Sequence, residues 1–90
     1  MNARTEVIVS NDNGVHVRPA TQIVETANRF ACRIILRRGD EEANAKSVIE
    51  VLQMAILQGE RIEVIAEGKG ADRGVKAIVA LFDEKFGFEK

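Results

Sequence analysis

The chain has 90 residues, which is the length of one small domain, and we expect residues 1–90 to fold as a single unit. Hydrophobic residues make up 46% of it and charged residues 30%, a balance typical of a globular chain and not of a disordered one. The 13 Lys and Arg residues against 14 Asp and Glu give a net charge of −1, and all four aromatic residues are Phe. Nucleic-acid binding favours a basic surface and stacking aromatics, so no nucleic-acid partner is expected.

The sequence also bears on compartment and cofactors. Its one cysteine, Cys32, cannot form an internal disulfide, which favours a reducing compartment. The first ten residues include Arg4 and Glu6 and lack the apolar centre of a secretory signal. No apolar run approaches the roughly 20 residues that a membrane helix needs, and no His, Cys, Asp or Glu cluster has metal-ligand spacing. We therefore expect a soluble, cytoplasmic monomer with no metal, cofactor or membrane insertion.

Hydrophobic periodicity predicts the element order βαββαβα. In chain order, the elements are expected at 5–10, 17–29, 32–37, 42–45, 48–57, 61–67 and 72–85. Each helix has one apolar stripe and the last strand alternates, so the economical fold is an α+β two-layer sandwich. Its three helices would cover one face of a four-stranded, mostly antiparallel sheet.

Two connecting segments and one strand end are also informative. Residues 11–14 form a dense turn signal after the first strand. Residues 68–74 are glycine-rich but lack nucleotide-binding spacing, so we interpret them as a turn. Arg37 and Arg38 are expected to lie in solvent at the end of a strand.

The single histidine, His16, lies where the first turn ends and the first helix begins. Pro19 is tolerated only in the first turn of a helix, which places His16 at or next to the N-cap. The first N–H groups of a helix have no partner within the helix and carry partial positive charge, so they favour anions. A helix cap without further function is the alternative for this residue.

The neighbouring groups suit phosphate chemistry. A neutral imidazole has a nitrogen lone pair that can attack phosphorus. Arg18 adds a permanently charged fork that matches phosphate oxygens, and the backbone amides of Val17 and Arg18 are candidate phosphate donors. These groups favour a histidine that accepts a phosphoryl group and holds it transiently.

Residues 14–20, GVHVRPA, resemble the active-site signature of the HPr family, the histidine-containing phosphocarriers of the bacterial phosphotransferase system. Residues 44–49, NAKSVI, resemble the second signature of the family, and the element order matches its open-faced sandwich along the whole chain. The resemblance implies that His16 is phosphorylated at Nδ1 by phosphorylated enzyme I, itself charged by phosphoenolpyruvate. The group would then pass to a IIA-type acceptor, while Arg18 neutralises its charge. Such a carrier has no turnover of its own.

Ser47 has two interpretations. Its hydroxyl is a plausible N-cap for the second helix. The resemblance also aligns it with a serine that a dedicated kinase phosphorylates in many family members. Phosphate there adds negative charge beside a surface that partners approach, which opposes docking. The residues leave both roles open.

The second helix carries more apolar residues than one buried face requires. Either the last helix or a loop covers the excess, or the excess forms a docking patch for partners. The candidate docking residues are Val48, Ile49 and Leu52, which fall where the partner contacts of the family lie. Glu50 stands where the family often has Gly.

The resemblance leaves the biological role open in one respect. Sugar transport and a nitrogen-related relay use similar carriers, and residues 81–87 resemble the nitrogen-related one. The main alternative is a regulatory module that acts by docking onto partners and not by relaying phosphate.

Overall fold

The computed structural model describes residues 1–87, in which four strands form one sheet. The strands, in chain order, are β1 (Asn2–Ile8), β2 (Arg33–Arg38), β3 (Glu41–Asn44) and β4 (Arg61–Glu67). The sheet order is β1-β4-β2-β3, and all three neighbouring pairs are antiparallel. The predicted α+β sandwich is therefore confirmed, with a sheet that is entirely antiparallel over the described residues.

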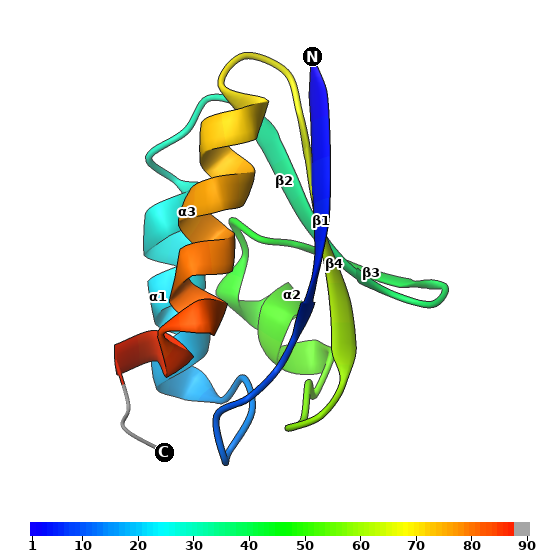
Figure 1. Ribbon diagram of the computed structural model, residues 1–90, viewed down its shortest axis with the longest axis vertical. Helices are drawn as coiled ribbons and strands as arrows, with labels where there is room; N and C mark the ends of the chain where they lie inside the picture. Colours follow the sequence, from blue (N-terminus) through cyan, green and yellow to red (C-terminus); the bar gives the residue numbers. More distant parts are fainter. Residues whose placement is uncertain (88–90) are drawn as a thin grey trace.

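All three helices lie on the same face of this sheet (Figure 1). They are α1 (Val17–Ala27), α2 (Val48–Gln53) and α3 (Ala71–Asp83), followed by the short 3-10 turn η1 (Lys85–Gly87). The long helices α1 and α3 pack side by side, and the short α2 contacts α1 near the end of the sheet where α1 begins (Figure 1). The other face of the sheet has no helix over it in the described part of the chain.

Alternation along the strands explains the layering. In β4, Ile62, Val64 and Ala66 are buried, while the residues between them are half-buried. Side chains alternate across a strand, so the buried set forms the face that meets the helices. Ile78 and Phe82 of α3 are also buried there, and Phe82 packs edge-on against Phe86 with ring centroids 4.9 Å apart.

The second helix is shorter than predicted. The expected helix ran from 48 to 57, whereas α2 ends at Gln53. The amide of Ala55 donates to Leu52 O, a tightened last turn, and Ala55 itself has a left-handed φ of +50°. The chain then turns inward, so that Ile56 is buried and Leu57 is exposed. The apolar periodicity of the sequence continues past Gln53, so it predicts a longer helix than the one that forms.

The first strand also differs at its boundary. It begins at Asn2 and not at Thr5, because all seven of its residues pair with β4, from Asn2 with Glu67 to Ile8 with Arg61. Within residues 1–87, no helix combines the length and hydropathy needed to cross a membrane.

Candidate functional site

His16 is the N-cap of α1, as the sequence predicted. Its backbone is extended, with φ −94° and ψ −161°, and its carbonyl accepts the first intrahelical bond from Ala20 N at 2.9 Å. Pro19 has no N–H, so the amides of Val17 and Arg18 are the donors at this helix end that precede the helical ladder. The histidine is half-buried, while Val17 and Arg18 are exposed. His16 and both amides that were expected to hold phosphate are therefore in one helix turn.

The segment that leads into α1, residues 9–16, is here called the histidine loop. Its turn is closed by Asn11, which is only 1% exposed. Asn11 accepts from Gly14 N at 3.1 Å through its carbonyl and donates to Gly14 O at 2.6 Å through Nδ2. Gly14 has φ +63°, and a Cβ on it would lie 2.2 Å from Ile56 O. Only glycine fits this position, two residues before the histidine.

The α2–β4 connection, residues 54–60, lies against the histidine loop along its length. At one end Val9 N donates to Glu60 O at 3.0 Å, and Gly59 N donates to Val9 O at 2.8 Å. At the other end Val15 N donates to Ile56 O at 3.0 Å. The backbone on both sides of the turn is therefore fixed by a segment about 45 residues away in sequence.

The second motif is built around the start of α2. Ser47 is the N-cap, and its Oγ accepts from Glu50 N at 3.3 Å, which confirms its capping role. The Glu50 carboxylate also lies in the first turn and accepts from Asn44 N at 2.9 Å. Lys46 extends away from this point and donates to Phe30 O at 2.7 Å. Ser47 therefore has a carboxylate in the same helix turn.

Three large exposed apolar side chains lie on segments that include or contact the histidine loop or α1. Val17 is 62% exposed, Ile49 64% and Leu57 63%, and we call these three residues the apolar rim. Val17 directly follows His16, Leu57 lies beside Gly14, and Ile49 is on α2, which packs against α1. Of the predicted docking residues, Ile49 is thus on the surface.

The other two predicted docking residues, Val48 and Leu52, are half-buried and pack on the core. Leu57 is not among the predicted docking residues, because the expected helix includes it whereas α2 ends at Gln53. For Val17, the sequence predicts a role only for the backbone amide.

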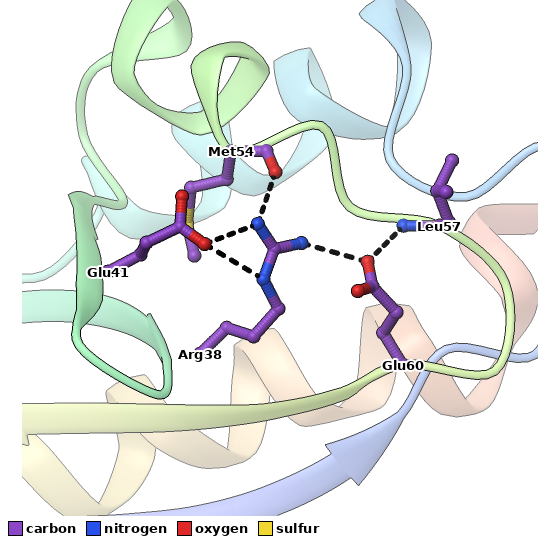
Figure 2. A network of polar contacts seen from close by, with 5 residues as sticks. All are labelled: Arg38, Glu41, Met54, Leu57 and Glu60. Atoms are coloured by element: carbon purple, nitrogen blue, oxygen red, sulfur yellow. Dashed lines mark hydrogen bonds and ion pairs between the residues drawn. The ribbon is translucent and has the colours of Figure 1, made fainter.

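Arg38 lies at the far side of the α2–β4 connection and is not solvated as predicted. Figure 2 shows its guanidinium between Glu41, Glu60 and the Met54 carbonyl. Its side chain is 23% exposed. Hydrogen bonding to Glu41, together with attraction to Glu60, raises the pKa of Arg38 above its ordinary value despite the opposing effect of burial. No local pattern predicts this contact, because Met54 and Glu60 belong to the α2–β4 connection, whose position beside β2 depends on the strand order.

Two further features complete the picture of the surface. Among the described residues, no group of three His, Cys, Asp or Glu side chains is placed to hold a metal ion.

On the open face of the sheet, Glu63 accepts from Arg37 at 2.6 Å and is 3.7 Å from Arg4. The hydrogen bond from Arg37 lowers the pKa of Glu63, aided by the charges of Arg37 and Arg4.

The open-faced α+β sandwich with a histidine at the N-terminus of its first helix defines a class of small domains. Comparisons with known proteins place this chain in the same class. Residues 3–84 match the family model described as the PTS HPr component phosphorylation site. The crystal structure of HPr-C-His from Thermoanaerobacter tengcongensis superposes with a TM-score of 0.94 and 32% identity, over 98% of this chain and 99% of that one. The chain belongs to the HPr family of phosphotransferase-system phosphocarriers.

Individual relatives include both free-standing and fused proteins. The phosphocarrier protein HPr of Treponema pallidum is 42% identical over 80 residues, covering 89% of this chain and 91% of that protein. The phosphocarrier protein NPr of Escherichia coli K12 is 34% identical over 96% of this chain and 97% of that protein. A multiphosphoryl transfer protein of Xanthomonas campestris is 38% identical over 97% of this chain. The matched region is only 10% of the length of that protein.

Proposed function

We propose that this chain accepts a phosphoryl group on His16 from phosphorylated enzyme I and passes it to a histidine of a IIA-type acceptor. The observation that supports this most directly is the position of His16 as the N-cap of α1, beside the amides of Val17 and Arg18. The family assignment supports a phosphocarrier role in general. The identity of the donor as enzyme I and of the acceptor as a IIA-type protein is our proposal. We further propose that the protein acts in the cytoplasm as a monomer.

The chemistry is a pair of in-line displacements. A ring nitrogen of His16 attacks phosphorus, a new P–N bond forms, and the bond between phosphorus and the donor breaks, so that the donor keeps that electron pair. In the second transfer, the acceptor attacks phosphorus and His16 leaves with its electron pair. Positioning and charge neutralisation carry most of the catalysis in phosphoryl transfer. The helix amides and the Arg18 guanidinium would supply this chain's share of both.

Labelling with radioactive phosphoenolpyruvate and enzyme I tests the proposal. The wild-type protein is expected to take up phosphate that is labile in acid and stable in base. His16→Ala is expected to take up none, because the accepting nitrogen is gone. Labelling of His16→Ala at the normal rate would place the acceptor elsewhere and end the proposal.

Docking is proposed to use Val48, Ile49 and Leu52, extended by Val17 and Leu57. Ile49 and Ile8 form a matched pair, because they are 64% and 55% exposed but lie on α2 and β1. Ile49→Asp is expected to raise the KM for phosphorylated enzyme I about tenfold, since an apolar contact at the centre of an interface costs more than about 1 kcal/mol when it is lost and about 1.4 kcal/mol corresponds to a tenfold change. Ile8→Asp should leave the KM unchanged. Equal effects of the two substitutions would exclude α2 as the docking surface.

Ser47 phosphorylation by a serine kinase is proposed as a control on docking. The modified oxygen would stand in the turn that already holds Glu50, so the added charge would repel an acidic partner surface. A Ser47→Asp variant with reduced affinity for enzyme I, compared with Ser47→Ala, would support this. Equal affinities of the two variants would argue against it.

A second candidate is the nitrogen-related branch, or a regulatory protein of that branch that works by docking. The 34% identity to an NPr over nearly the whole of both chains favours keeping it. Parallel labelling with a sugar-type and a nitrogen-type enzyme I distinguishes the branches by rate. A purely regulatory protein would be labelled by neither.

A further inference from the structure

The α2–β4 connection is held on two sides. On one side, it bonds to both ends of the histidine loop, through Val9 at Gly59 and Glu60 and through Val15 at Ile56. Val15 directly precedes His16, so its bond to Ile56 sets where the phosphoacceptor side chain begins. The connection is therefore the support on which the histidine loop rests.

On the other side, a single side chain holds the connection at its beginning and its end (Figure 2). Arg38 Nη2 donates to Met54 O at 2.7 Å, and Nη1 donates to the Glu60 carboxylate at 2.8 Å. The same Glu60 oxygen accepts from Leu57 N at 2.7 Å. Glu41 fixes the guanidinium by accepting from Nε and Nη2 at 3.2 and 2.7 Å. A planar fork with several donors can bridge these groups, whereas the single ammonium of lysine cannot.

We propose that Arg38 and Glu60 are positioning residues for phosphoryl transfer, acting on His16 through the α2–β4 connection. This rests on the proposed function. The two residues fix the connection, the connection fixes Val15 through Ile56 O, and Val15 fixes the place of the imidazole beside the α1 amides. Glu60 also holds Leu57 of the apolar rim, because its carboxylate accepts a hydrogen bond from the Leu57 amide.

Backbone bonds to Val9 and Val15 also hold the connection, but Arg38 is the side chain that reaches both its beginning and its end. The left-handed Ala55 of the connection is strained for a residue with a Cβ. Removing the guanidinium leaves Met54 O and the half-buried Glu60 carboxylate without their charged donor. Relaxation of the connection would displace the histidine loop, and a misplacement of about 1 Å can slow a positioned reaction about 100-fold. We expect a smaller displacement, and a phosphate-acceptance rate about tenfold lower.

Arg38→Met is the test variant and Arg37→Met is its matched control. Both residues lie on β2 and both are ion-paired, with side chains 23% and 32% exposed. Arg37, however, pairs with Glu63 on the open face of the sheet and does not reach the connection. The measurements are the rate of phosphate acceptance from enzyme I, hydrogen exchange at the Val15 amide, and the urea midpoint of each variant.

Arg38→Met is expected to accept phosphate about tenfold more slowly than wild type and to lose protection from hydrogen exchange at the Val15 amide. For Arg37→Met, the acceptance rate and the Val15 exchange rate are both expected to stay within about twofold of wild type. Glu60→Gln, which keeps an acceptor oxygen, is expected to show an intermediate loss and guards against a failure of Arg38→Met to fold. A normal acceptance rate in a folded Arg38→Met would overturn the proposal. So would rates that fall equally in both arginine variants, since that result indicates general stability alone. If wild type itself is not labelled, the proposed function fails, and Val15 exchange still reports on the positioning.

Discussion

Replacing Gly14 by alanine measures how tightly the α2–β4 connection supports the histidine loop. The added Cβ would lie 2.2 Å from Ile56 O and 2.9 Å from Leu57 Cα, and the backbone at Gly14 has φ +63°. A left-handed L-residue costs about 1–2 kcal/mol, and forced overpacking costs about 1–3 kcal/mol more. The lower entropy of the unfolded alanine chain returns about 0.4–1 kcal/mol. We expect the free energy of unfolding to fall by about 2–4 kcal/mol.

Gly39→Ala is the control for this substitution. Gly39 has a similar φ of +60°, but among the described residues no heavy atom beyond its own two chain neighbours lies within 4 Å of its added Cβ. Only the backbone cost applies, so the expected loss is about 1 kcal/mol. Urea unfolding of both variants gives the difference, which isolates the clash with the connection. Equal losses would refute the reasoning, as would a normal phosphate-acceptance rate in Gly14→Ala.

Two further substitutions test the cap and the open face. Ser47→Ala is expected to lower the free energy of unfolding by about 1 kcal/mol, because the Glu50 amide loses its acceptor; an unchanged urea midpoint would count against the cap. Arg37 holds the pKa of Glu63 below its unfolded value, so the stabilisation is present above the unfolded pKa and is lost as the pH falls through the folded pKa. Glu63→Gln should therefore be less stable than wild type at neutral pH, and the two should converge in acid. A constant difference across that range would contradict the assignment.

Local signals predicted the elements that depend on local chemistry. His16 was placed at a helix start because the preceding turn and Pro19 leave few other conformations, and the structure has it as the N-cap. Ser47 was placed as a cap for a similar reason. The predicted end of α2 was wrong, because the point where this helix ends depends on contacts with residues distant in sequence. Ile56 turns inward to the core, and the Met54 carbonyl is held by Arg38 from β2.

The support of the site was not predictable in the same way. Periodicity assigns faces to strands but not their order in the sheet. The meeting of Arg38 with Glu60 requires β2 and β4 to be neighbours, as they are in the order β1-β4-β2-β3. The bond from Val15 to Ile56 likewise joins two segments that share no sequence signal. Arg38 was therefore expected in solvent, although it organises the connection behind the histidine.

The residues that position His16 and the residues of the apolar rim should differ in their effects, because a carrier has to serve two transfers. In the proposed function, the same imidazole takes part in two transfers with two different proteins, so the geometry that this chain supplies has to serve both. Groups that position His16, such as Gly14 and Arg38, affect the histidine itself, and their loss should slow both transfers by similar factors. Ile49 of the apolar rim is proposed to contact whichever partner is bound, so its loss should affect the two transfers unequally. Comparing donor and acceptor rates for each variant therefore separates the two roles without a structure of either complex.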